Sequence, residues 1–458
     1  MGKEKFTVAC HEAIGRAKKD DVITVIIRTK LKSIAEQEVR LAFDMLQEEQ
    51  MATSRAHLFN RVNERYGQGA EFCQNYQESR IKAQKKLVNA APEATNLWLA
   101  DAVAVKGNKI QIEDLAKHED VESIDVNPTF RLPEILQTPL EDTPEAVDGS
   151  TWGLAKIQAP EVWGGFGRGE KILVGHLDTG VDDTHPALTN KVAAFEEFDS
   201  LGNPMGTPTH DSHFHGTHTA GTICGRNFRG VNIGVAPDAK LCSALVLPGG
   251  GGSFSQIIGG MQWLLTKHVD VMNMSLGALG YTTIWNIPIL ITTLSGVCVV
   301  ASIGNSGHGT SGGPGNDPLA FGVGATGVGF RNDSQNNGHD DVVAGFSGGE
   351  TLSEPWLFFN VTYMKPDLSA PGVQVLSSIP GPDMAAFNGT SMAAPHVAGS
   401  IALLLSTEPQ LKGDPFTVKR IFLGAGREDF GEGGRDQRFG FGRLDVLSAA
   451  EAAVSLIN

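Results

Sequence analysis

The run Asn-Gly-Thr-Ser-Met-Ala-Ala-Pro-His-Val-Ala-Gly at 388–399 constrains the fold of this 458-residue chain more than any other stretch. It ends a polar, glycine-rich region and opens the apolar run 400–405. Thr390 and Ser391 are residue types that favour helix N-caps, and Pro395 is tolerated in a first turn, where no intrahelical bond needs its N–H. The stretch therefore predicts a closely packed helix with Ser391 in its first turn.

This position gives Ser391 a chemical meaning. A helix N-terminus carries a partial positive charge and free backbone N–H groups, which can stabilise the oxyanion of acyl transfer. A serine nucleophile also needs a base and a group that orients the base. Two stretches offer them: an apolar strand at 171–181 that contains Asp178, and a helix of small residues at 215–222 that opens with His215.

Three motifs occur in the chain order Asp, His, Ser: Asp-Thr-Gly-Val-Asp at 178–182, His-Gly-Thr-His at 215–218 and Gly-Thr-Ser-Met-Ala-Ala-Pro-His at 389–396. This is the order of subtilisin and differs from those of chymotrypsin and the α/β-hydrolases. The chain resembles the subtilisin-like serine proteases (subtilases) over nearly all of 152–450. The resemblance implies that Ser391 is the nucleophile, His215 the general base and Asp178 the residue that orients the imidazole. Each residue alone would more often be a cap, a buried polar group or a turn residue.

Short apolar strands alternate with helical stretches from Trp152 onward, at 172–177, 241–247, 269–274, 297–301 and 321–325. Such alternation predicts an α/β fold, in which a parallel sheet has helices on both faces. The subtilase resemblance implies the three-layer subtilisin-like arrangement, in a catalytic domain that we place at 151–458.

The first part of the chain has a different pattern. It predicts strands at 22–30, 97–105 and 121–126 and helices at 33–65, 75–88 and 109–117, which suits a small α+β unit with its helices on one face of a sheet. This unit resembles the inhibitory propeptide of subtilases, best over 97–132. We therefore expect a propeptide, acting as intramolecular chaperone and inhibitor, at 1–132. The segment 133–150, rich in Pro, Glu, Asp and Thr, is expected to be an exposed linker with the processing site.

The resemblance also suggests residues for the rest of the site. Asn305, after a buried strand, matches the oxyanion-hole residue, although an Asn before Gly or Ser is common in turns. Two segments match the walls of the substrate pocket, and a third matches an edge that pairs with extended substrate or is only a mobile loop. The residues are, in that order, Ser275, Leu276 and Gly277; Ser302, Ile303 and Gly304; and Gly249, Gly250 and Gly251. No carboxylate lies in these walls, which favours uncharged, apolar or broad specificity.

Metal chemistry is the weaker interpretation. His210, His213 and His218 lie near His215 and could form a metal site, but no His-Glu-x-x-His spacing is present. We expect no required cofactor and no metal at the active site. Many subtilases hold calcium with a carboxylate near the position of Ala187 and with a loop that corresponds to 226–232; here that loop contains two arginines and no acid. We therefore do not expect that calcium site, and weaker sites elsewhere stay open.

Charge and composition limit the partners. The net charge is −15, so neither nucleic acid nor an anionic membrane is an expected partner, and no apolar run reaches membrane-spanning length. The five cysteines form no Cys-x-x-Cys pair. Reduced thiols favour a cytoplasmic protein; the alternative is a secreted one whose export signal is absent from this chain.

The sequence thus predicts a self-processing serine endopeptidase that acts on polypeptides and is inhibited by its own propeptide. Two alternatives stay open. One is a catalytically silent, protease-like binding protein that its N-terminal domain holds closed. The other is a metal hydrolase that uses the histidine cluster.

Overall fold

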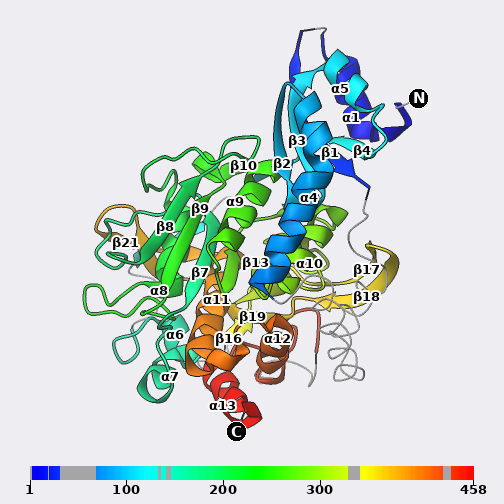
Figure 1. Cartoon of the computed structure of the whole chain (residues 1–458). Helices are drawn as coiled ribbons and strands as arrows, with labels where there is room; N and C mark the ends of the chain where they lie inside the picture. Colours follow the sequence, from blue (N-terminus) through cyan, green and yellow to red (C-terminus); the bar gives the residue numbers. More distant parts are fainter. Residues whose placement is uncertain are drawn as a thin grey trace.

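The structure is a computed structural model of the whole chain (Figure 1). It describes residues 3–18, 20–30, 69–132, 136–140, 146–328, 341–426 and 435–457. The expected helices at 33–65 lie outside the described residues.

A large sheet forms the centre of the molecule. Its strand order is β16-β15-β13-β11-β7-β9-β8, and β19 pairs with β15 beside this path. All pairings are parallel except that of β16 with β15. The strands are β7 (Leu173–Asp178), β8 (Val192–Glu197), β9 (Lys240–Leu245), β11 (Val271–Met274), β13 (Cys298–Ser302), β15 (Phe321–Val328), β16 (Asp341–Val343) and β19 (Leu368–Pro371).

Helices cover both faces of this sheet. Alternate residues of one strand enter opposite cores: Met272 and Met274 of β11 pack on one face, and Val271 packs on the other. The first face is covered by α9 (Phe254–Thr266) and α10 (Asn286–Leu294), the second by α8 (Phe214–Cys224), α11 (Thr390–Thr407) and α13 (Val446–Ile457). This three-layer α/β arrangement confirms the fold class predicted from the sequence.

The N-terminal residues form a separate antiparallel sheet with the order β2-β3-β1-β4. One face, with Val25 and Ile27, packs against helices. The opposite face, with Ile26, packs toward the unit built on the large sheet, which we call the catalytic unit after the domain expected at 151–458. The elements are α1 (Val8–Arg16), β1 (Val22–Thr29), α4 (Ala70–Ala90), β2 (Glu93–Leu97), η2 (Trp98–Ala100), β3 (Ala102–Asn108), α5 (Lys109–Leu115) and β4 (Val121–Val126).

The prediction of a single strand at 97–105 is wrong. The apolar run is divided into the end of β2, the one-turn helix η2 and β3, and Asp101 between them has φ 50°. Trp98 and Leu99 are buried, and η2 contacts α9 and α10. Their apolar character therefore serves the contact between the two units rather than a continuous strand.

Two short strands connect the N-terminal sheet to the catalytic unit. β5 (Thr129–Arg131) pairs antiparallel with β10 (Gly251–Ser253), and β6 (Leu136–Thr138) pairs with β21 (Asp383–Asn388). Part of the segment expected as an exposed linker is therefore hydrogen-bonded to the catalytic unit. The remaining described α-helices and strands are α6 (Trp152–Lys156), α7 (Ala159–Gly165), β12 (Ala278–Leu279), β14 (Gly312–Gly313), β17 (Glu350–Trp356), β18 (Phe359–Lys365), β20 (Val375–Ile379) and α12 (Pro415–Gly424).

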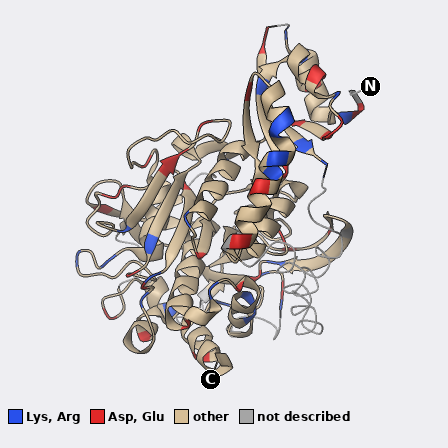
Figure 2. Ribbon diagram, viewed as in Figure 1, with Lys and Arg blue, Asp and Glu red and all other residues tan. Residues whose placement is uncertain are grey.

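The charge distribution suits this contact. Figure 2 shows that α9 and α10 carry no Lys, Arg, Asp or Glu, whereas α4 beside them carries charges of both signs. The N-terminal unit thus covers an uncharged layer of the catalytic unit. Within the described ranges, no helix is both long and apolar enough to cross a membrane.

Candidate active site

Ser391 lies in the first turn of α11, whose N-cap is Gly389. The helix begins at Thr390, so Pro395 lies one turn further in than expected from the sequence. Proline has no N–H to give to the carbonyl four residues earlier, which is that of Ser391. The hydroxyl of Ser275 donates to this carbonyl instead, at 2.8 Å. The proline is therefore accommodated by a side chain from the loop after β11.

Ser275 and Ser391 are joined by a second hydrogen bond. The Ser391 hydroxyl donates to the Ser275 carbonyl, with 3.2 Å between the oxygens. Among the described contacts, this bond is the one that the Ser391 hydroxyl makes. The Ser391 hydroxyl must turn away from Ser275 before a histidine can take its proton.

Asp178 and His215 form a close buried pair. β7 ends on Asp178, α8 begins one residue before His215, and Asp178 Oδ1 lies 2.6 Å from His215 Nδ1. Both side chains are buried, and α11, which carries Ser391, contacts α8 and β7. The three elements thus place the three motif residues in one region.

The environment of Asp178 favours its ionised form. Burial acts to raise the pKa of Asp178, but its electrostatic interaction with His215 and hydrogen bonds from His215 and the Thr179 N–H outweigh this effect. The pKa of Asp178 therefore lies below its usual value. A carboxylate at this position keeps the proton of His215 on Nδ1 and leaves Nε2 to act as a base.

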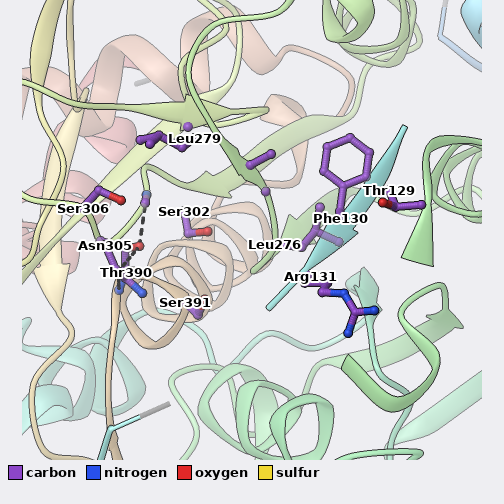
Figure 3. A pocket seen from close by; sticks show the side chains of 14 residues that line it. Thr129, Phe130, Arg131, Leu276, Leu279, Ser302, Asn305, Ser306, Thr390 and Ser391 are labelled. Atoms are coloured by element: carbon purple, nitrogen blue, oxygen red, sulfur yellow. Dashed lines mark hydrogen bonds between the residues drawn. The ribbon is translucent and has the colours of Figure 1, made fainter. Parts of the chain in front are cut away.

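Asn305 lies beside the start of α11. Its Oδ1 accepts from the Thr390 backbone N at 2.9 Å and from the Thr390 hydroxyl at 2.8 Å, as the dashed lines in Figure 3 mark. These two donors fix the orientation of the amide. Nδ2, which has no acceptor among the described residues, is left as a donor near Ser391.

A cavity of about 250 Å³ opens between Ser391 and β5 (Figure 3). Of the predicted wall residues, Leu276, Gly277, Ser302 and Gly304 line it, together with Asn305. Ser275 holds Ser391, and the buried side chain of Ile303 does not line the cavity. Ser391 also lines it, and residues that the sequence did not assign to the pocket complete the lining: Thr129, Phe130, Arg131, Ala278, Leu279, Ser306, Gly312 and Thr390.

The predicted edge segment pairs with the chain itself. Gly251 lies opposite Arg131 in the β5–β10 pair, and the Leu132 N–H donates to the Gly250 carbonyl at 2.8 Å. Gly249 makes no such pair; its N–H donates to the Ser212 hydroxyl at 3.1 Å. β5 is thus added to the edge of the catalytic unit in the manner of a bound extended peptide.

Phe130 anchors this strand. Its side chain is 4% exposed, and its ring centroid lies 5.3 Å from that of Trp285, which in turn lies 5.5 Å from that of Phe254. An aromatic pocket therefore receives the side chain of β5 that points into the catalytic unit.

The other candidate histidines bond within the protein. His213 Nδ1 accepts from the His215 N–H at 3.4 Å, and His210 Nδ1 lies 2.9 Å from the Pro208 carbonyl. His218 Nε2 lies 3.0 Å from the Val375 carbonyl, and burial lowers the pKa of His218 to about 3. In the part of the chain that the structure describes, no three His, Cys, Asp or Glu side chains are grouped as metal ligands.

The loop at 226–232 is tied down by protein groups. Arg229 donates to the Pro382 carbonyl at 2.8 Å and to Asp383 Oδ1 at 3.2 Å, and its guanidinium lies over the ring of Phe228. Ala187 is buried. A guanidinium thus links this loop to β21 and the turn before it.

Comparison with known proteins gives independent evidence of the family. The model of the subtilase family matches residues 169–442, more than half of the chain. The chain is 35% identical over 263 residues to subtilisin E of Bacillus subtilis, which covers 56% of this chain and 61% of that protein. It is 32% identical over 260 residues to the major intracellular serine protease of Bacillus subtilis, covering 56% of this chain and 76% of that protein. It is 36% identical over 293 residues to M-protease of Shouchella clausii, covering 64% of this chain and 68% of that protein.

The matched part therefore spans about 61% of the length of subtilisin E. The range that the family model matches, 169–442, contains Asp178, His215, Asn305 and Ser391. With the three-layer sheet and the Asp178–His215 pair, this match shows that the chain belongs to the subtilase family.

Proposed function

We propose that this subtilase is a serine endopeptidase that is made as a self-inhibited precursor. The observation that carries the proposal is the 2.6 Å contact between Asp178 and His215, in the same region as a serine at the start of a buried helix. The names of its relatives, a subtilisin and an intracellular serine protease, support the same reaction.

The geometry supports one set of roles. The Ser391 hydroxyl turns from Ser275, gives its proton to His215 and attacks the substrate carbonyl, and Asp178 stabilises the imidazolium that forms. The backbone N–H of Ser391 and the Nδ2 group of Asn305 donate to the oxyanion. His215 then gives its proton to the leaving amine, and water hydrolyses the acyl-enzyme.

The substrate is an extended polypeptide. β10 offers a strand edge, as its pairing with β5 illustrates, and Leu276 and Leu279 give the cavity apolar walls. The pocket around Phe130 favours substrates with a bulky apolar side chain at the corresponding position. Neither nucleic acid nor a membrane is part of this function.

The N-terminal unit acts as the inhibitor. β5 occupies the substrate edge, and β6 pairs with the strand that leads to Ser391. The chain is therefore hydrogen-bonded to the catalytic unit both before and after the stretch that separates Arg131 from Leu136. We place the processing site between Leu132 and Leu136, a narrower range than 132–150.

Fluorophosphonate labelling tests the reaction. The self-processed wild-type protein should be labelled on Ser391 and should cleave a peptide with a bulky apolar residue, while the Ser391→Ala protein should do neither. Chelators should not prevent labelling. A wild-type protein that neither reacts nor turns over peptide would instead be a binding protein, and loss of activity on chelation without labelling would indicate the metal hydrolase.

A further inference from the structure

A second histidine lies behind the catalytic aspartate. His176 precedes Asp178 by two positions on β7, so both side chains point to the same face of the sheet, where α8 packs. His176 is fully buried in the middle of the sheet, opposite Ser243 of β9 and Asn273 of β11. The roles proposed above for Asp178, His215 and Ser391 do not use it.

Thr219 of α8 connects the two residues. Its hydroxyl oxygen lies 2.8 Å from His176 Nε2 and 3.1 Å from Asp178 Oδ2. The Gly216 carbonyl is a second acceptor at 3.1 Å, but an ionised carboxylate is the stronger one. On the other side of the ring, His176 Nδ1 lies 3.0 Å from the Ser243 hydroxyl.

These contacts define the direction in which each hydrogen bond between Ser243, His176, Thr219 and Asp178 is donated. If the Thr219 hydroxyl donates to Asp178, its oxygen can accept from His176 only when the proton of His176 is on Nε2. Nδ1 then accepts from the Ser243 hydroxyl. The chain runs Ser243, His176, Thr219, Asp178, and every buried hydrogen-bonding group in it has a partner. Bonds aligned in this way strengthen one another.

The charged groups around His176 agree with a neutral ring. Burial lowers the pKa of His176; Asp178 and Asp211 oppose this effect, and His215 adds to it. A neutral ring has one donor and one acceptor nitrogen, which the chain requires.

We propose that His176 and Thr219 are positioning residues for Asp178, and that together they supply the hydrogen bond to Oδ2 that fixes the rotation of the carboxylate. Oδ1 is held by the Thr179 N–H at 2.8 Å and by His215, whereas Thr219 is the side chain that holds Oδ2 among the described residues. This inference rests on the proposed function, because it assigns Asp178 its part in catalysis.

The test starts from the full-length chain and lets it process itself. Active sites are then counted by titration, and activity is measured on a small peptide substrate. Thr219→Val keeps the shape of the side chain and removes the hydroxyl. We expect kcat to fall about 10- to 100-fold with little change in KM, since the bond lost is to a charged group. His176→Leu should give a smaller fall in kcat. The double variant should be no slower than Thr219→Val, because His176 acts through Thr219.

The pH profile separates positioning from stability. Loss of the Thr219 donor makes Asp178 attract the His215 proton more strongly, so the acidic limb of kcat/KM should move to higher pH in Thr219→Val. His176→Leu should move it in the same direction by less, because Thr219 keeps its bond to Asp178 but loses the one from His176 that strengthens it. Thr219→Ser should recover most of the loss. Thr222→Val is the matched control: Thr222 is also buried on α8, but its hydroxyl donates to the His218 carbonyl at 3.2 Å.

Three results would overturn the inference in a wild-type protein that is active: an unchanged kcat in Thr219→Val, additive losses in the double variant, or an acidic limb that stays in place. If Thr219→Val does not fold, the acidic limb of kcat/KM in His176→Leu decides alone. An acidic limb that stays at the wild-type pH in this variant overturns the inference. An inactive wild-type protein would instead refute the proposed function, so the two failures are distinguishable.

Discussion

Thr390 gives both of its donors, the backbone N and the hydroxyl, to Asn305 Oδ1. The amide can therefore present only its Nδ2 group to the cavity. A donor that is fixed before the reaction costs no reorganisation when charge develops on the substrate oxygen. At the scale of the residue, this fixed amide supports the proposed role of Asn305.

Asn305→Ala should lower kcat about 10²- to 10³-fold and leave KM nearly unchanged, because the lost hydrogen bond forms mainly in the transition state. Steady-state kinetics on a peptide substrate measure both constants. Asn305→Asp is the matched variant: it keeps the acceptor for Thr390 but has no Nδ2–H, and should lose at least as much activity. An effect confined to KM would refute the assigned role.

The sequence could indicate the candidate site only where short motifs carry it. Asp178, His215 and Ser391 each stand in a recognisable local pattern, and the chain order connects them. His176 and Thr219 stand in no such pattern. Their meaning depends on the packing of α8 against β7 and on the register between β7 and β9, both of which are tertiary facts.

β5 shows a similar limit at the scale of the element. The glycines of β10 suggested an edge for a peptide, but nothing in the sequence showed that Phe130 and Arg131 would occupy it. The prediction of a single strand at 97–105 is wrong for a related reason. An apolar run is equally suited to a strand or to an interface, and only the contact of η2 with α9 and α10 distinguishes them.

Phe130→Ala should weaken inhibition by the N-terminal unit about 10²-fold, because a buried aromatic anchor is lost from the centre of a contact. The inhibition constant of the self-cut complex, measured by dilution into substrate, reports this change. Arg131→Ala, in the same strand but with an exposed side chain, should have a much smaller effect. Equal effects would show that strand pairing, rather than the aromatic pocket, gives the affinity.

The loop at 226–232 leads to a prediction about metal removal. Arg229 supplies a positive charge to the Pro382 carbonyl and Asp383, so a cation is already built into this loop. EDTA should therefore shift the melting temperature of the Ser391→Ala protein by less than about 2 °C. A large destabilisation that only calcium reverses would reveal a strong calcium site.

At the scale of the whole molecule, one buried carboxylate links three distant parts of the catalytic unit. Asp367 Oδ2 accepts from Lys365 of β18 at 2.6 Å, from Lys419 of α12 at 3.1 Å and from the Gly322 N–H of β15 at 2.8 Å. The side chains of Asp367, Lys365 and Lys419 are all buried. Such a cluster is costly to break, because it would leave the buried amines of Lys365 and Lys419 without the carboxylate to which both are hydrogen-bonded.

Asp367→Asn should destabilise the fold by about 3–5 kcal/mol, which lowers the melting temperature on the order of 10 °C. The measurement is a thermal scan in the Ser391→Ala background, which prevents self-digestion. Asp238→Asn is the control, since the side chains of its pair with Arg168 are 42% and 44% exposed and the pair should contribute less than about 1 kcal/mol. Similar shifts in both variants would contradict a structural role for the buried cluster.

The central claim is that the two units form a precursor that cuts itself. A tethered inhibitor faces the cleft at an effective concentration in the mM range for a flexible linker, so it can inhibit even with modest free affinity. We propose that cutting removes this advantage and that destruction of the released fragment then switches activity on.

Intact-mass measurement on purified wild-type and Ser391→Ala proteins tests this claim most directly. The account predicts that the wild-type chain separates into two fragments cut between Leu132 and Leu136, and that the Ser391→Ala chain stays at its full 48.7 kDa. Clipping of the Ser391→Ala chain at the same bond and with the same time course would contradict self-processing.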